Sequence, residues 1–292
     1  MTHSVCILLC TYNGEKYLRE QIESLFNQKN VDMAIMAHDD GSTDGTADIL
    51  KEYNIPVFGG GHLGAAHGFF YLMEQAPKAD YYAFCDQDDI WDEDKISVAV
   101  NALGMSQKPM IYCSSTRLVS EDGAFVTTHR VDSSRTLPSR LFYSSISGNT
   151  IVFNSSMRDV ALMHHPERMV MHDSWLVKLC IAVGGRLIID EDAHIDYRMH
   201  GSNTVGMELN LNQKIGKFKR VVNGQGEGQE LIDICSLYGL MVKPEYRMLA
   251  ADTEKTRTDP KCRANFMKDH GIDFKNKGFN MAFAMKVKKG NL

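Results

Sequence analysis

The sequence lacks the features that mark several large classes of protein. No apolar run approaches the roughly 18 to 20 residues needed to cross a bilayer. The apolar stretch Val5–Cys10 is too short for a signal peptide, and no basic segment precedes it. The seven cysteines are scattered and contain no CxxC pair, which argues against a disulfide framework and a structural zinc site. The net charge of −5 gives no reason to expect a nucleic-acid partner. These absences predict a cytoplasmic protein, with peripheral contact at the inner face of the cell membrane left open.

Two glycine-rich nucleotide-binding motifs are also missing. No GxGxxG follows the first apolar run, and neither GxxxxGKS nor GxxxxGKT occurs in the chain, so the dinucleotide-binding and P-loop fingerprints are both absent. What is present is ordinary for a globular enzyme: 292 residues, of which 43% are hydrophobic and 24% are charged. This length suits one large domain, or one domain with a helical appendage.

Short apolar runs alternate with polar turns and helical patterns in the first part of the chain. The four runs are Val5–Cys10, Ala34–Ala37, Val57–Phe58 and Tyr81–Phe84. This order predicts βαβ units, and therefore an α/β fold with a mostly parallel central sheet flanked by helices. In such sheets, ligands bind beyond the carboxyl ends of the strands.

Polar and acidic residues concentrate at these predicted carboxyl ends. They are Thr11, Tyr12 and Asn13 after the first run, Asp39 and Asp40 after the second, and Asp86, Gln87, Asp88 and Asp89 after the fourth. Carboxylates this close together repel one another, and a cation among them relieves the repulsion. Oxygen ligands favour Mg²⁺ or Mn²⁺, which commonly bridge carboxylates to phosphates. A solvated acidic turn is the alternative for an isolated DxDD motif, but the polar residues at the other strand ends favour a site.

Three further motifs follow in the second part of the chain. Ser147-Gly148-Asn149 precedes a strand-like run, His172–Trp175 opens a predicted helix, and Arg198–Asn203 forms a polar loop. Asp173 lies in the first turn or at the cap of its helix, so N-capping is the alternative to a chemical role. Trp175 could stack on a sugar or belong to the core.

The composition changes from about residue 207, and the segment 207–292 is predicted to be a helical extension. Its last part, Lys261–Leu292, holds eight Lys or Arg and two Asp, with apolar residues such as Met281 and Met285 among them. A basic amphipathic tail can bind an anionic membrane surface. A solvated helical tail is the alternative.

Taken together, these motifs resemble those of the family 2 glycosyltransferases with the GT-A fold, particularly bacterial rhamnosyltransferase-like members. The matching motifs are Cys10–Gly14, Asp39–Thr46, Cys85–Trp91, Ser147–Asn149, His172–Trp175 and Tyr197–Asn203. The resemblance spans about residues 4 to 206. It implies a catalytic domain at 1–206, with a nucleotide-binding half at 1–108 and an acceptor half at 109–206, and leaves 207–292 as a variable extension.

The resemblance also implies roles on the donor side. Thr11, Tyr12 and Asn13 would line the nucleobase and ribose pocket. Asp39 or Asp40 would hydrogen-bond the base, with Asp40 favoured. The DxD pair would place Asp88 on a metal that bridges the diphosphate, and Asp86, beside Gln87, nearer to the ribose and the metal-bound waters.

Further roles carried over by the resemblance concern the reaction and the acceptor. Asp173 resembles the catalytic base of inverting members. Arg198 and His200, on the loop that also holds Asn203, could close over the diphosphate, and His200 could also reach the metal. The acceptor side would include His172, Gly148 and Trp175.

The chemistry of these residue types fits sugar transfer. A departing diphosphate gains negative charge that a divalent ion stabilises, and an attacking hydroxyl needs a base. One base without a neighbouring nucleophile predicts a single displacement with inversion. The expected reaction moves a sugar from TDP-rhamnose or a UDP-hexose to a hydroxyl of a cell-surface polysaccharide or glycolipid precursor.

Two other functions are weighed against this one. A sugar nucleotidyltransferase would need a glycine-rich loop with Lys or Arg directly after the first strand, and Thr11–Glu15 is not one. A non-catalytic nucleotide-sugar-binding scaffold would tolerate loss of Asp86, Asp88 or Asp173, and all three are present.

Overall fold

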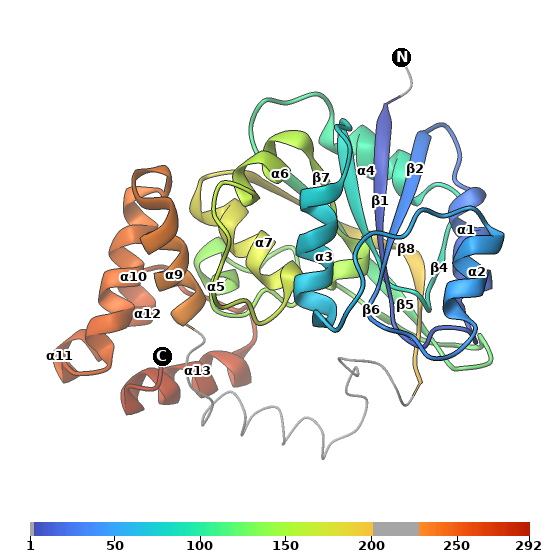
Figure 1. The fold of residues 1–292 in the computed structure, drawn as a ribbon. Helices are drawn as coiled ribbons and strands as arrows, with labels where there is room; N and C mark the ends of the chain where they lie inside the picture. The colour runs from blue at the N-terminus through green and yellow to red at the C-terminus, as the bar shows by residue number, and fades with distance from the viewer. Residues whose placement is uncertain (1–2, 201–227) are drawn as a thin grey trace.

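A computed structural model describes residues 3–200 and 228–292 of the chain. Its centre is one eight-stranded sheet with the order β2-β1-β3-β7-β5-β8-β4, and β6 pairs with β5 outside this path. Helices cover both faces of the sheet, and the C-terminal helices pack together beside one end of it (Figure 1).

The strands and helices have the following bounds. The strands are β1 Ser4–Thr11, β2 Asp32–Asp39, β3 Tyr81–Cys85, β4 Ile90–Trp91, β5 Met110–Val119, β6 Phe125–His129, β7 Val152–Asn154 and β8 Arg186–Arg198. The helices up to the sheet's last strand are α1 Leu18–Phe26, α2 Thr46–Glu52, α3 Gly64–Gln75, α4 Lys95–Leu103, α5 Leu137–Arg140, α6 Ser155–Ala161 and α7 His172–Ala182. The C-terminal helices are α9 Gln229–Tyr238, α10 Pro244–Thr256, α11 Pro260–Arg263, α12 Phe266–Asp269 and α13 Lys277–Lys289.

Strand β1 shows why the apolar runs are continuous. Its side chains alternate between the two faces of the sheet, so Leu8 joins the core cluster that includes residues of α3 and α7, whereas Ile7 and Leu9 join the one that includes residues of α1 and α4. All three are fully buried. β1 pairs in parallel with both β2 and β3, so the three strands end at the same edge.

The predicted α/β class is confirmed, and the sheet is mixed in a way that the strand pattern did not predict. β7 lies antiparallel between β3 and β5, while β5 and β8 pair in parallel. The apolar residues 187–189 and the later residues 194–197 belong to one long strand, β8. The predicted strand at residues 57–58 is only an isolated bridge between Ala37 and Val57.

The C-terminal helices share a core with the sheet domain. Leu231 and Ile234 of α9 are fully buried in the cluster that includes residues of α7, and the Tyr238 hydroxyl donates to the Ala161 carbonyl of α6 at 3.1 Å. The predicted domain boundary at residue 206 lies outside the described residues. Among the helices at 3–200 and 228–292, none is long and apolar enough to cross a membrane.

Asn154 is a hydrogen-bonding centre of the fold, and its replacement gives a first test. Its side chain caps α6 at the Met157 amide, accepts from the Met110 amide, and donates to the carbonyls of Ser106 and Lys108. Because Asn154 is buried, Asn154→Ala leaves these groups unpaired and is expected to lower the free energy of unfolding by about 2–4 kcal/mol.

Urea unfolding followed by circular dichroism measures this loss. The matched control is Asn101→Ala on the exposed face of α4, which is expected to change the free energy of unfolding by less than about 0.5 kcal/mol. Equal stabilities of the two variants would contradict the role given to Asn154.

Candidate active site

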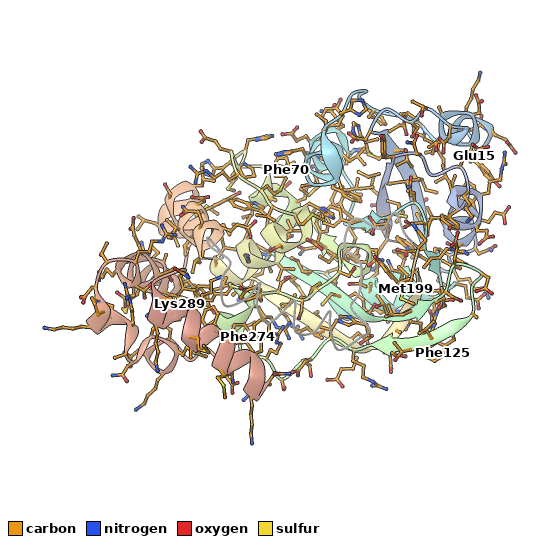
Figure 2. All side chains as sticks on the ribbon, turned by 90° about the horizontal axis from the view of Figure 1, so that it is seen from below. Glu15, Phe70, Phe125, Met199, Phe274 and Lys289 are labelled. Atoms are coloured by element: carbon orange, nitrogen blue, oxygen red, sulfur yellow. The ribbon has the colours of Figure 1, made fainter. Side chains whose placement is uncertain are left out.

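The candidate site lies at the edge where β1, β2 and β3 end. Figure 2 views the molecule from the end toward which these strands run, with Lys289 and Phe274 of the C-terminal segment on one side and Glu15 on the other. The structure brings the predicted polar residues of the three strand ends together at this edge, because the strands are parallel and in adjacent positions.

The acidic turn that follows β3 holds one buried carboxylate, that of Asp89, and two half-buried ones, those of Asp86 and Asp88. Burial, and then the charges of Asp88 and Asp173, raise the pKa of Asp86 to about 7. Burial also raises the pKa of Asp88, against the effect of its hydrogen bond with His200. Asp89, only 1% exposed, has a pKa well above its usual value because of burial and the two neighbouring aspartates. Ionising all three carboxyls therefore costs free energy unless a cation or hydrogen-bond donors stabilise the charge.

Two residues beside this turn had no role in the sequence interpretation. Lys95, at the start of α4, is 1% exposed and lies with its Nζ 3.3 Å from the centroid of the Trp91 ring. Burial lowers its pKa to about 7, and its charge opposes the rise in the pKa of Asp86. The Asn149 amide donates to the Asp89 carboxylate and so joins the 148–150 turn to the acidic turn. Neither contact has a signal in local sequence, because each joins distant segments.

His200 lies against the acidic turn. Its Nε2 lies 2.8 Å from Oδ2 of Asp88, and the Tyr17 ring stacks on the imidazole at 4.8 Å. Asn203, predicted on the same loop, lies outside the described residues.

Arg198, predicted to close over the diphosphate, instead binds groups of the protein itself. The side chain is 5% exposed, and its guanidinium donates to the backbone carbonyls of Asp88 and Glu121 and to the Glu20 carboxylate. It also lies over the Tyr17 ring, 4.9 Å from the centroid. These contacts hold the end of β8 against the acidic turn and α1.

The donor atoms at this edge fit a hard divalent cation. A carboxylate oxygen of Asp88 and an imidazole nitrogen of His200 are close enough for one ion, and the carboxylate oxygen is a ligand that suits Mg²⁺ and Mn²⁺. A different group of possible metal ligands, Asp92, Asp94 and His194, also occurs among the described residues. One ligand atom from each of these side chains lies within 4.8 Å of the other two. Asp92 there is already paired with the guanidinium of Arg117.

The end of β1 offers one exposed ring. Tyr12 is 52% exposed and faces His62 edge-on at 6.3 Å, whereas Thr11 is only 2% exposed. The Gln87 amide both accepts from the Tyr12 amide at 2.8 Å and donates to the Tyr12 carbonyl at 3.0 Å. The Asn13 side chain accepts from the Thr43 amide at 2.9 Å. The backbone at Tyr12 is thus fixed to the acidic turn, while its ring is open to a ligand.

The two adjacent aspartates after β2 hold different loops. Asp39 accepts from the Thr11 hydroxyl at 2.8 Å and from the Ser42 amide at 2.9 Å. Asp40 accepts from the amides of Leu63 and Gly64 and so lies at the start of α3. Both carboxylates shape the loops around the open ring of Tyr12.

Helix α7 brings Asp173 to the same edge. The Ser174 amide donates to Oδ1 of Asp173 at 2.6 Å, and burial raises the pKa of this carboxyl to about 6. A Cβ added to Gly148 would lie 2.7 Å from Nε2 of His172 and 3.3 Å from the Asp173 Cβ, so this close approach requires glycine.

His172 and Trp175, predicted at the acceptor, are core side chains in this structure. His172 is 4% exposed and lies between the rings of Phe69 and Phe84, at 4.0 and 4.6 Å. Burial lowers its pKa to about 3, so the imidazole is neutral. Trp175 is 1% exposed. Both side chains shape the wall behind Asp173.

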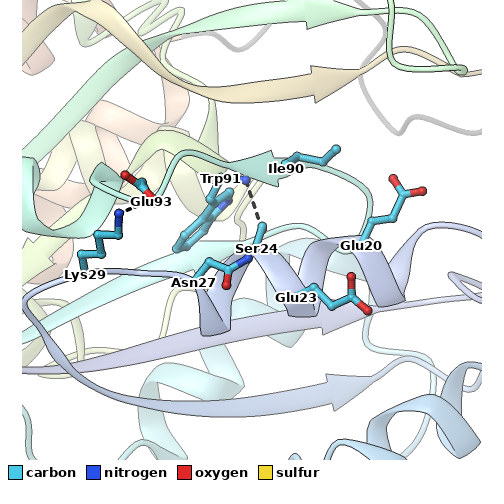
Figure 3. A pocket seen from close by; sticks show the side chains of 8 residues that line it. All are labelled: Glu20, Glu23, Ser24, Asn27, Lys29, Ile90, Trp91 and Glu93. Atoms are coloured by element: carbon cyan, nitrogen blue, oxygen red, sulfur yellow. Dashed lines mark hydrogen bonds and ion pairs between the residues drawn. The ribbon is translucent and has the colours of Figure 1, made fainter.

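A separate open hollow of about 650 Å³ lies between α1 and β4 (Figure 3). Its lining residues are Glu20, Glu23, Ser24, Asn27, Lys29, Ile90, Trp91 and Glu93. The Ser24 hydroxyl accepts from the Trp91 amide at 3.1 Å and joins the two walls. None of the residues predicted from the sequence for the site lines this hollow.

Comparison with known proteins identifies the family. The model of the family described as "Glycosyl transferase family 2" matches residues 6–170, more than half of the chain. The dTDP-rhamnosyl transferase RfbG of Shigella flexneri is 28% identical over 235 residues, covering 74% of this chain and 79% of that protein. TuaG of Bacillus subtilis, named for teichuronic acid biosynthesis, is 28% identical over 154 residues, covering 51% of this chain and 58% of TuaG.

Solved structures show the same fold. S. aureus TarS 1–349 in complex with UDP-GlcNAc has a TM-score of 0.57 at 15% identity, covering 100% of this chain and 90% of that one. The mannosyltransferase PcManGT from Pyrobaculum calidifontis, in complex with GDP-Man and Mn²⁺, has a TM-score of 0.55 at 14% identity. The match covers 99% of this chain and 85% of that one. The chain belongs to glycosyl transferase family 2 and is a glycosyltransferase with the GT-A fold predicted from its motifs.

Proposed function

We propose that this protein is a metal-dependent, inverting glycosyltransferase. It moves a sugar from a nucleoside-diphosphate donor, TDP-rhamnose or a UDP-hexose, to a hydroxyl of a cell-surface polysaccharide or glycolipid precursor. The named activities of RfbG and TuaG support this donor and acceptor class. Residues 1–206 form the catalytic domain in this proposal. The observation that carries it is the contact of Asp88 with His200 at the strand-end edge that also holds Asp173.

The donor lies across the ends of β1, β2 and β3. Its nucleobase stacks on the exposed ring of Tyr12, near the loops held by Asp39 and Asp40. Asp88 and His200 would hold a Mn²⁺ or Mg²⁺ ion, and Asp86 would lie on the ribose side of that ion. When bound, this ion stabilises the negative charge of the departing diphosphate.

Asp173 removes the proton of the acceptor hydroxyl. The hydroxyl oxygen forms its bond to the anomeric carbon as the bond from that carbon to the diphosphate breaks, and the proton passes to the Asp173 carboxylate. The diphosphate leaves with its bonding electron pair. One displacement without a covalent enzyme intermediate inverts the configuration of the anomeric carbon.

The assignment of Asp88 predicts the behaviour of a near-isosteric variant. Asp88→Asn removes one negative oxygen ligand, so it is expected to weaken Mn²⁺ binding and to lower kcat/KM by about 100-fold or more, as loss of a transition-state charge stabiliser does. Calorimetric titration with Mn²⁺ and release of nucleoside diphosphate from a panel of donors measure the two effects.

The matched control for this test is Asp94→Asn, in the second group of possible ligands. It is expected to leave both quantities unchanged. Loss of Mn²⁺ binding in Asp94→Asn but not in Asp88→Asn would overturn the metal assignment. Donor binding with no turnover in the wild-type chain, with every acceptor tried, would favour the non-catalytic scaffold.

The role of Asp173 predicts a pH dependence. Its carboxyl has a pKa of about 6, and only the deprotonated form can accept a proton. With saturating Mn²⁺, kcat is therefore expected to fall about tenfold per pH unit below that value and to level off above it. Asp173→Asn should lower kcat by about 10²- to 10⁴-fold and abolish the fall of kcat at low pH. A rate that is flat from about pH 5 to 8 would contradict the assignment.

The outer face of α13 is the part of the chain that we assign to an anionic lipid surface. Met281 and Met285 are 62% and 43% exposed, and the exposed Lys277, Lys288 and Lys289 lie on the same helical stripe. Residues 261–292 have a net charge of +6, whereas the rest of the chain has −11. Figure 1 places α13 at the end of the molecule toward which β1 runs, so binding there brings a lipid-linked acceptor near the site.

Charge reversal tests this surface. The triple variant Lys277→Glu, Lys288→Glu, Lys289→Glu is expected to weaken binding to vesicles with anionic phosphatidylglycerol by at least about 100-fold, since each nearby basic residue contributes about 1 kcal/mol. Vesicle sedimentation measures the binding. The control reverses three exposed lysines elsewhere, at Lys51, Lys78 and Lys108, and should bind like the wild-type chain. Equal binding of both variants would overturn the assignment.

A further inference from the structure

The C-terminal helices hold α7 at both of its ends. At the carboxyl end, the Lys243 amide donates to the Ala182 carbonyl at 2.8 Å. At the amino end, the carboxylate of Glu230, in the first turn of α9, accepts from the Val170 amide at 3.2 Å and from the Ser174 hydroxyl at 3.3 Å. In the sequence, Asp173 lies between Val170 and Ser174, the two residues that donate to Glu230.

Glu230 also forms a buried ion pair. Nζ of Lys178, one turn further along α7, lies 2.5 Å from Oε2 of Glu230, and the two side chains are 5% and 9% exposed. Buried ion pairs add little stability when compared with apolar residues of similar volume, because both charges lose their hydration. A buried pair at this position is therefore better explained by the geometry that it fixes.

A short path of contacts leads from Glu230 to the candidate base. The Ser174 hydroxyl contacts Glu230, while the amide of the same residue donates to the Asp173 carboxylate at 2.6 Å. A shift of the first turn of α7 therefore moves the Asp173 carboxylate directly. The part of the chain matched by the family ends at residue 170, before α7 begins, so neither partner of this pair lies within it.

We propose that Glu230 is a positioning residue for sugar transfer: it fixes the first turn of α7, and with it the direction in which Asp173 meets the acceptor hydroxyl. The proposal rests on the proposed function, in which Asp173 is the base. It makes the C-terminal extension a part of the catalytic apparatus. Because the donor contacts lie on β1, β2 and the acidic turn, the donor site does not depend on Glu230.

The first test separates catalysis from donor binding. Glu230→Gln keeps an acceptor for the Val170 amide and removes the charge that pairs with Lys178. It is expected to lower kcat about 10- to 100-fold, the cost of a small misplacement of a catalytic group, with donor KM and calorimetric donor affinity within about twofold of wild type. All rates are normalised to the folded fraction measured by circular dichroism.

A double variant separates positioning from stability. Lys178→Met with Glu230→Leu replaces the ion pair by apolar side chains, so the chain is expected to regain stability relative to Glu230→Gln. Its kcat is expected to stay low, because the contacts with Val170 and Ser174 are lost. Recovery of kcat to the wild-type value would show that Glu230 acts through stability alone and would overturn the proposal.

Tyr238→Phe is the matched control on the same helix. It removes the contact of α9 with the Ala161 carbonyl on α6 and leaves the first turn of α7 untouched. Its kcat is expected to equal that of the wild-type chain. A loss of kcat as large as that of Glu230→Gln would assign the effect to general loosening of α9 and would overturn the proposal.

Asp173→Asn distinguishes this proposal from the proposed function. A wild-type kcat in Asp173→Asn would overturn the assignment of the base and the role of Glu230 together. A low kcat in Asp173→Asn with a wild-type kcat in Glu230→Gln would overturn the role of Glu230 alone. Low kcat in both, with unchanged donor affinity, is the expected result.

Discussion

Crowding of carboxylates in a buried turn is the constraint on which the rest of this site depends. Asp86, Asp88 and Asp89 follow a fully buried strand, and burial raises the pKa of each. The surrounding structure supplies partners from every side: the ammonium of Lys95 from α4, the Asn149 amide from the turn before β7, and the imidazole of His200 from the end of β8. These contacts gather α4, the turn before β7 and the end of β8 around one acidic turn, since buried or half-buried carboxylates need hydrogen bonds or opposite charges nearby.

The elements nearest to this turn were predictable because they obey local rules. Continuous apolar runs such as Val5–Cys10 fit strands covered on both faces, and polar residues at their ends marked the edge where parallel strands meet. The resemblance to the family placed Asp88, and as a hypothesis His200, on one metal ion, and the two side chains are in contact in the structure. The family assignment and the GT-A fold are confirmed. The roles of the individual site residues remain predictions.

What local patterns could not predict are features set by long-range pairing. The antiparallel β7 carries no mark of its direction, because strand direction depends on its neighbours in the sheet. Arg198 has the chemistry of a phosphate ligand, but its guanidinium is directed to backbone carbonyls and Glu20. Trp175 fits a sugar platform by residue type, and its burial follows from the packing around α7. Glu230 gave no signal, since its partners Val170, Ser174 and Lys178 lie more than fifty positions earlier in the chain.

The unequal distribution of charge has a consequence for how the molecule approaches a surface. With +6 in residues 261–292 and −11 in the rest of the chain, the protein carries an electric dipole as well as a net charge. Near an anionic surface the field attracts one end of this dipole and repels the other, which exerts a torque. At physiological salt the field fades over about 8 Å, so the torque acts only within about that distance of the surface. In the membrane contact proposed for α13, this torque would turn the basic end of the molecule toward the lipid before any side chain touches it.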